Sequence, residues 1–312
     1  MLGGRPRRGA FMFRQRALTA LVGIPITLAA IYLGGWYLAG LVALVGVAGM
    51  RELGRITAAA ALREPGAAAS EGALTALPEA PLFVWARRVF VSVGYLFALL
   101  LPAIYTLDQG SRLAEVGIAA GAAVGLGIAV GAGRRGTAVQ VSALVTGVGA
   151  LVTPALITYC VRLRGLGARS APLWGHLPAG AAWLFLAFAA CWAADTAAYA
   201  VGKKWGRRKL WPAVSPGKTV EGAIAALAAS IVVTAFFGAL ARLPLGLGMG
   251  LGAILGVTGQ IGDLAESKLK RWAGVKDSGA ILPGHGGVLD RFDSLLANAP
   301  VAYYYLRSLA GV

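Results

Sequence analysis

Nine apolar stretches, separated by polar or glycine-containing segments that range from a single residue to more than thirty, follow one another along the 312 residues. Most are close to the roughly twenty residues that a helix needs to cross a hydrocarbon core of about 30 Å. Some neighbours are joined by very short turns, such as Gly34-Gly35. The pattern predicts an all-α, polytopic integral membrane protein with about nine transmembrane helices, at residues 17–34, 36–50, 89–107, 113–131, 138–161, 180–201, 219–241, 245–262 and 295–311.

The composition agrees with this class, since 58% of the residues are hydrophobic, 13% are charged and the mean hydropathy is +0.71. Such a chain leaves no room for a sizeable soluble domain. A net charge of +16 also occurs in nucleic-acid-binding proteins. In so apolar a chain, however, excess Lys and Arg marks loops that face anionic lipid headgroups, so we expect membrane lipid and no nucleic acid as a partner. Cys160 and Cys191 lie in apolar stretches and are expected to be small buried hydrophobic residues.

Charge also predicts the orientation of the helices. Residues 1–16 form a basic arm before the first apolar stretch, which we interpret as an uncleaved first span. With this arm in the cytoplasm, the inner segments hold 23 of the 29 Lys and Arg. That excess predicts a cytoplasmic N-terminus and a C-terminus on the opposite side. Residues 162–178 fit least well, because they place Arg162, Arg164 and Arg169 on the outer side.

The chain divides by composition into two membrane regions. Residues 17–161 form N-terminal helices interrupted by a segment, 57–82, that is rich in Ala, Pro, Gly and Glu and is expected to be a mobile cytoplasmic loop. Residues 180–311 form a C-terminal catalytic region with a cytoplasmic motif loop at 263–294. All of the candidate chemistry lies in this second region.

The first candidate pair is Asp195 and Tyr199. They are four residues apart and therefore share a helix face. Asp195 lies within an apolar span, where an ionised carboxylate is costly and is by default a functional residue. The alternative is that it bonds a neighbouring helix.

The second cluster is Ser215-Pro-Gly-Lys218-Thr219-Val-Glu221-Gly222, directly before an apolar helix. Its Gly-Lys-Thr resembles the end of a phosphate-binding P-loop, but the first glycine of that motif is missing and we expect no preceding strand, so a Walker site is rejected. Ser215 or Thr219 can cap the helix, while Lys218 and the helix N-terminus offer positive potential to a phosphate. Capping and ligand contact are equally plausible here. The basic run just upstream, Lys203 to Lys209, is interpreted as a topology or lipid-contact signal.

The third cluster is the most polar. Asp263, Glu266, Ser267 and Lys270 recur at helical spacing and would form one polar face. Asp290 and Asp293 would likewise share a face at the start of the last helix. Carboxylates that converge from separate helices suit Mg²⁺, which keeps several waters and takes few protein oxygens. A solvated charged loop is the alternative, but it does not explain the Pro-Gly-His-Gly-Gly segment between the two pairs.

Residues 267–293 resemble the signature of the phosphatidate cytidylyltransferase (CDP-diacylglycerol synthase) family, without departure across twenty-seven positions. The residues that carry the match are Ser267, Leu269, Lys270, Arg271, Lys276, Asp277, Gly279, Leu282, Pro283, His285, Gly286, Gly287, Asp290, Arg291 and Asp293. The two upstream clusters resemble that family's Asp-Thr-x-Ala-Tyr and Ser-Pro-x-Lys-Thr-x-Glu-Gly segments. Gly217 stands where many members have a second Lys, which affects only a secondary phosphate contact.

The resemblance implies an all-helical enzyme of the bacterial inner (plasma) membrane, forming a homodimer, with its active site facing the cytoplasm. The reaction would convert CTP and phosphatidate to CDP-diacylglycerol and pyrophosphate with Mg²⁺, and it leaves room for a monovalent ion such as K⁺. Joining two anions in this way requires mainly positioning and charge neutralisation.

The roles that we assign on this resemblance fall into four groups. Asp263 and Asp290 would hold Mg²⁺, with Asp293 and then Asp277 next in order. Four cations would neutralise the triphosphate and the lipid headgroup, namely Lys270, Arg271, Lys276 and Arg291. His285, Gly286 and Gly287 would form an anion-binding turn. The remaining substrate contacts would come from Asp195, Tyr199, Ser215, Lys218, Thr219, Glu221 and Ser267.

Three other functions share some of these sequence features. A CDP-alcohol phosphatidyltransferase should show an Asp-x2-Asp-Gly-x2-Ala-Arg motif, which this chain lacks. A CTP-dependent polyprenol or phytol kinase would release CDP instead of pyrophosphate. A transporter could use an intramembrane acid such as Asp195 for coupling, but matching interrupted helices in the two halves are not evident.

Overall fold

The computed structural model describes residues 6–61, 80–108, 111–132, 138–167, 177–281 and 286–311. Within these ranges each of the nine predicted spans falls on one helix. The helices are α1 (Pro6–Leu33), α2 (Gly35–Ala61), α3 (Ala80–Leu107), α4 (Leu113–Ala132), α5 (Ala138–Gly165), α6 (Ala179–Trp205), α7 (Val220–Leu240), α8 (Leu245–Ala273) and α9 (Leu289–Leu309). Six contain segments long and apolar enough to cross a membrane, and two further apolar segments, Leu21–Leu33 and Leu113–Ala123, are shorter. The all-α membrane class is confirmed, while nine crossings stay a prediction.

Several helices run past the apolar stretches that predicted them. α2 continues to Ala61 and α3 begins at Ala80, so both ends of the predicted loop 57–82 are helical, and residues 62–79 lie outside the described ranges. α8 continues to Ala273 and α9 begins at Leu289, so the motif loop is shorter than the predicted 263–294. The polar residues of the third cluster therefore sit on helix ends, which fixes their directions more firmly than a loop would.

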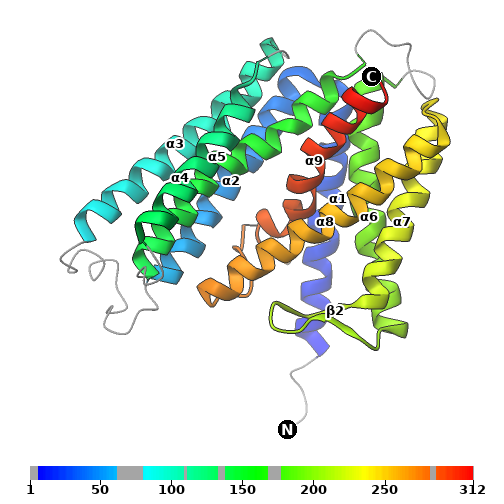
Figure 1. The fold of residues 1–312 in the computed structure, drawn as a ribbon. Coiled ribbons are helices and arrows are strands. Elements are labelled where there is room, and N and C mark those ends of the chain that lie inside the picture. Colours follow the sequence, from blue (N-terminus) through cyan, green and yellow to red (C-terminus); the bar gives the residue numbers. More distant parts are fainter. Residues whose placement is uncertain are drawn as a thin grey trace.

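The helices form two groups joined by α9 (Figure 1). α5 packs on α2, α3 and α4, while α7 packs between α6 and α8. α9 contacts α8 on one side and α5 on the other, and so connects the groups. The N-terminus lies at the same end of the molecule as the strand segment β2, and the C-terminus lies at the opposite end (Figure 1).

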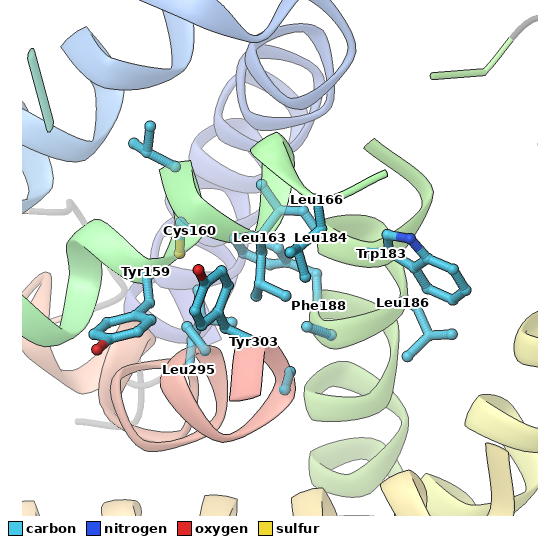
Figure 2. Close-up of a cluster of buried hydrophobic side chains, with 14 of the residues drawn as sticks. Tyr159, Cys160, Leu163, Leu166, Trp183, Leu184, Leu186, Phe188, Leu295 and Tyr303 are labelled. Atoms are coloured by element: carbon cyan, nitrogen blue, oxygen red, sulfur yellow. The ribbon is translucent and has the colours of Figure 1, made fainter. Parts of the chain in front are cut away.

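The core lies where α5, α6 and α9 meet (Figure 2). α6 contributes Trp183 and Leu184, and Leu163 of α5 and Leu295 of α9 pack into the same cluster. Lipid tails are as apolar as these side chains, so close van der Waals packing stabilises the contact more than the hydrophobic effect does. Gly180 allows that closeness, because a Cβ there would collide with the backbone of the last turn of α5.

A two-stranded antiparallel hairpin interrupts the helices, with β1 at Lys209–Trp211 and β2 at Ser215–Thr219. The expectation that no strand precedes α7 was wrong, because the Pro-Gly segment pairs with Lys209–Trp211 instead of forming a loop. Thr219 ends β2 and caps α7, accepting a hydrogen bond from the Gly222 N–H at 3.1 Å. Of the two predicted caps, Thr219 is therefore the one used.

Candidate active site

A cavity of about 430 Å³ opens between α6, α7 and α8, beside the hairpin. Each of the three polar clusters identified in the sequence lies on or next to one of these helices, so the cavity forms where the clusters come together. Six of the predicted site residues line it, namely Asp195, Tyr199, Ser215, Lys218, Thr219 and Asp263. The first two clusters and the leading acid of the third thus meet at one place, whereas Asp290, which was predicted to share a metal with Asp263, is not among the residues that line the cavity.

Small residues form much of the cavity wall. Gly202, Gly222, Gly256 and Gly259 all line it. A Cβ on Gly222 would lie 2.8 Å from the carbonyl oxygen of Ala198, so glycine is what lets α7 approach α6 this closely. Apolar residues such as Ala226 and Leu255 line the same cavity together with the charged residues Asp195, Lys218 and Asp263. The cavity can therefore take a ligand with a charged end and a less polar end.

Acidic side chains gather on one side of this cavity. Asp263 forms an ion pair with Lys218, with 2.5 Å between Oδ2 and Nζ. Burial, and then the negative charge of Asp263, raises the pKa of Asp293 to about 7; Asp195 adds to the rise, and Lys218 opposes it. These three carboxylates thus lie in one another's field, with Lys218 as a nearby compensating cation.

Lys270 forms a second charged centre, seven residues after Asp263 and thus about two helical turns further along α8. Its ammonium donates to Glu266 Oε2 at 2.9 Å and to Asp290 Oδ1. Burial raises the pKa of Asp290, but the Lys270 ammonium and the N–H groups of Gly287 and Ser278 outweigh it and hold the pKa below its usual range. Asp290 is therefore ionised and already engaged by a cation.

Asp290 also organises the motif loop. Its Oδ2 accepts hydrogen bonds from the N–H of Gly287 at 2.9 Å, and from the N–H and hydroxyl of Ser278 at 3.1 and 2.9 Å. The hydroxyl of Ser278 is also 3.0 Å from Glu52 of α2. Sequence reasoning missed Glu52, because a single acid in the N-terminal half carries no motif.

Several predicted residues make structural contacts. Arg271 donates to the carbonyl oxygens of Val214 and Val275, which ties the hairpin to the end of α8. Glu221 accepts from the N–H groups of Arg207 and Arg208 and closes the loop before β1.

The remaining predicted residues are placed as follows. Ser267 donates to Asp263 at 3.4 Å, as the shared helix face predicted. Lys276, Asp277 and Arg291 are exposed. Gly286 has φ +84°, a left-handed conformation that favours glycine. His285 lies outside the described residues.

Other cavity residues were not predicted. Lys203 lines the cavity one helical turn after Tyr199. This spacing places it on the same helix face as Asp195 and Tyr199, so the sequence could have indicated it. Asn298 of α9 lies at the cavity wall, donating to Cys191 Sγ at 3.2 Å and accepting from Thr258. Gln260 bridges α8 and α7 through the carbonyl oxygen of Ala223. Asn298 and Gln260 are single uncharged polar residues in apolar helices, and no sequence pattern marks them as cavity residues. Cys160 and Cys191 are buried free thiols, which confirms that prediction.

Carboxylate oxygens are the donor set for a hard cation such as Mg²⁺. Among the described residues, no group of three or more His, Cys, Asp or Glu is arranged tightly enough to hold a metal by itself. Mg²⁺ commonly uses one or two carboxylates together with waters and substrate phosphates, so the pair Asp263 and Asp293 fits its requirement. Burial raises the pKa of Asp293 most, and the negative charges of Asp263 and Asp195, which such a cation would offset, raise it further.

Comparison with known proteins gives one consistent picture. The model of the cytidylyltransferase family matches residues 14–309. A phosphatidate cytidylyltransferase of Synechocystis sp. is 33% identical over 94% of this chain and 96% of its own length. Proteins of the same name from Bacillus subtilis and Staphylococcus aureus (strain COL) are 48% and 46% identical over 41% and 39% of this chain. These two matches span 48% of each relative's length.

Proposed function

We propose, from the premise that this chain belongs to the cytidylyltransferase family, that it transfers the cytidylyl group of CTP to phosphatidate. The products are CDP-diacylglycerol and pyrophosphate. The Synechocystis relative, matched over nearly its whole length, is named for this activity. The observation that carries the assignment is the meeting of Asp195, Lys218 and Asp263 at one cavity between apolar helices.

The geometry suits a reaction between a lipid and a water-soluble nucleotide. A phosphate oxygen of phosphatidate attacks the α-phosphorus of CTP, and the bond from that phosphorus to the oxygen bridging the α- and β-phosphates breaks. Pyrophosphate leaves with the bonding electron pair. Both reactants are anions, so the site must supply positive charge and alignment more than proton transfer.

Within this proposal, Lys218 lies at the cavity and contacts the incoming phosphates, exchanging its pairing with Asp263 for a phosphate oxygen. Tyr199 and Lys203 lie at the same wall, on the last two turns of α6. The exposed cations Lys276 and Arg291 are assigned to the triphosphate or the headgroup. Lys270 instead holds Glu266 and Asp290 in place.

Asp263 and Asp293 are the residues that we assign to Mg²⁺. When bound, the cation would neutralise phosphate charge and orient the triphosphate. Asp290 was predicted to share this role; both of its oxygens have protein partners, so we assign it first to holding the motif loop. A K⁺ requirement remains part of the proposal through Asp195, which lies in the same negative field.

Inner-membrane location, a cytoplasmic site and a homodimer complete the proposal. The excess of Lys and Arg in the predicted inner segments supports the orientation. The hairpin lies at the same end of the molecule as the N-terminus, which agrees with that assignment (Figure 1). Labelling of single cysteines from either side of sealed vesicles tests the orientation. Light scattering of the detergent-solubilised protein tests the dimer.

The activity is tested with purified protein, CTP labelled in the cytidine, phosphatidate and Mg²⁺. Label should move into the organic phase together with release of one pyrophosphate per lipid product. Release of CDP with phosphorylation of an added polyprenol would instead indicate a kinase. No transfer to any lipid, with the protein folded, would reject the function.

A further inference from the structure

Glu52 of α2 is an acid far from every motif, and it is completely buried, with 0% of its surface exposed. Its Oε1 accepts from the Val288 N–H at 2.9 Å. Its Oε2 accepts from the Leu289 N–H at 2.8 Å and lies 3.0 Å from the Ser278 hydroxyl, whose single proton is shared between this carboxyl and Asp290. In the described part of the chain no Lys or Arg forms an ion pair with it. Its carboxyl oxygens therefore have two backbone N–H groups and one side-chain hydroxyl as partners.

These bonds supply what α9 lacks at its start. The residue before α9, Val288, provides no side-chain cap. The first N–H groups of a helix have no partner within the helix, and leaving them bare in an apolar setting is costly. Glu52 satisfies two of them from 236 and 237 positions away in the sequence. A carboxylate at a helix N-terminus is also favoured by the helix dipole.

The same carboxylate is linked to Asp290 through one side chain. The Ser278 hydroxyl lies 3.0 Å from Glu52 Oε2 and 2.9 Å from Asp290 Oδ2. Ser278 is 3% exposed, so water does not substitute for either contact. Displacing Glu52 would free this hydroxyl and the start of α9 together, and with them Asp290 and Asp293.

Two motif glycines fit around this carboxylate. A Cβ on Gly279 would lie 2.5 Å from Glu52 Oε1, and a Cβ on Gly287 would lie 2.6 Å from Oε2. Both distances are too short for a real contact. At Gly287 a Cβ would also lie 1.9 Å from the Ser278 Oγ, so Glu52 and Ser278 together leave no room for a side chain at these two positions.

We propose that Glu52 is a positioning residue for the cytidylyl transfer. It fixes the motif loop and the first turn of α9, so that Asp290 stays beside Lys270 and Asp293 stays in the field of Asp263. The expected change in kcat rests on the proposed function, whereas the structural linkage does not. Glu52 touches neither substrate nor metal and acts through Ser278 and the backbone of α9.

The decisive variant is Glu52→Gln, which keeps the size but replaces one acceptor with an NH₂ group that opposes backbone N–H donors. We expect kcat to fall by about tenfold or more while the KM for CTP changes by less than about threefold, because misplacement of reacting groups acts on the transition state. Amide hydrogen exchange at Val288 and Leu289 should accelerate. Glu52→Asp, which keeps the charge, should recover part of the kcat.

Glu115→Gln is the matched control. Glu115 is also an acid bonded across helices, to Arg162 and Tyr304, at the other end of the molecule. It should lower Tm without lowering kcat per folded molecule and without changing exchange at Val288. Ser278→Ala should lower kcat by itself, and should add little in a Glu52→Gln background, because the two changes break one linkage.

The outcomes separate this inference from the activity. If the wild-type protein makes no CDP-diacylglycerol, the proposed function fails, and unchanged amide exchange in Glu52→Gln would overturn the linkage independently. If the wild type is active and Glu52→Gln keeps its full kcat, or loses only Tm as Glu115→Gln does, the positioning role is wrong. If Glu52→Gln does not fold, Ser278→Ala decides, and full kcat in that variant overturns the proposal.

Discussion

The two ends of α9 bury charge in opposite ways. Near its last turns lies Arg162 of α5, only 2% exposed and ion-paired with Glu115. Three aromatic rings surround the guanidinium, whose central carbon lies 4.9, 4.9 and 4.3 Å from the ring centres of Tyr105, Tyr159 and Tyr303. One cation meets one anion and a cage of aromatic faces, which favour a cation.

At its first turns α9 carries Asp290, which pairs with Lys270, and Asp293, which lies near other acids. Asp293 lies in the field of Asp263 and Asp195, and Lys218 is the compensating cation there. This end adjoins the cavity, whereas the Arg162 cluster is packed among side chains. A buried ion pair is already neutralised and needs no ligand. An excess of carboxylates beside a cavity needs a cation or a proton to offset its charge. The difference assigns stability to one end and ligand binding to the other, and each prediction below tests one side of it.

The largest effect is expected for Asp263→Asn. The change removes one charge with little change of volume, and it leaves Lys218 without its anionic partner. Turnover should fall by about 10²–10³-fold, as is typical when a group that stabilises transition-state charge is removed. Tm of the detergent-solubilised protein should stay near the wild-type value, because a repulsion with Asp293 is relieved. Turnover is measured with labelled CTP, and Tm is measured by thermal unfolding.

An inactive variant with a collapsed Tm would show that Asp263 serves the fold. Wild-type turnover in Asp263→Asn would remove it from the metal and substrate site altogether.

The second prediction concerns the C-terminal end of α9, where Arg162 pairs with Glu115. Arg162→Met should destabilise the protein by about 3 kcal/mol, because Glu115 is left without its cation in a partly buried site. The kcat of the molecules that remain folded should be unchanged, since the cluster lies away from the cavity. The measurement is Tm together with activity per folded molecule.

A double variant, Arg162→Met with Glu115→Gln, should recover much of the lost Tm, because the uncompensated charge is then gone. Loss of kcat in the single variant at full Tm would show that the two ends of α9 are coupled.

Much of the helical framework could be predicted from the sequence, because apolar length determines which segments can be buried in lipid. All nine predicted stretches lie on helices. The meeting of Asp195, Lys218 and Asp263 was also predictable, since each is a costly polar residue at a helix end or within a span.

The partners of these residues could not be predicted, because they depend on which helices pack together. Nothing local marks Glu52 as the cap of a helix 237 residues away. Arg162 was assigned to an outer segment, yet α5 continues past it and pairs it with Glu115. The hairpin was missed because its pairing depends on β1, whose basic sequence resembled a loop.

Lys218→Ala tests the role of the cavity in ligand binding, and we expect a smaller loss of activity than for Asp263→Asn. Lys218 lies on β2 and pairs with Asp263, and its side chain is 28% exposed, so solvent already weakens the interaction. We expect kcat/KM for CTP to fall by about tenfold, mostly through KM, if the ammonium contacts the triphosphate in both ground and transition states. Lys204→Ala is the control, because Lys204 is exposed and lies over the Trp205 ring at 4.5 Å. Equal losses in both variants would indicate a general effect of surface charge.

The smallest expected effect is a pH dependence of stability at the acidic end. Burial and the charge of Asp263 raise the pKa of Asp293 to about 7, well above its value in an unfolded chain. A carboxyl with a raised folded-state pKa contributes stability at low pH that is lost as the pH rises toward 7, because the folded state binds the proton more tightly. In the presence of a chelator, Tm should therefore fall between about pH 4 and 7, and Asp293→Asn should flatten this slope and be the more stable protein at pH 8. Mg²⁺ should raise the wild-type Tm more at pH 8 than at pH 5, since the cation and the proton compete for the same oxygens. A slope that persists unchanged in Asp293→Asn would place the titrating group elsewhere, and would leave the two ends of α9 less different than their side chains indicate.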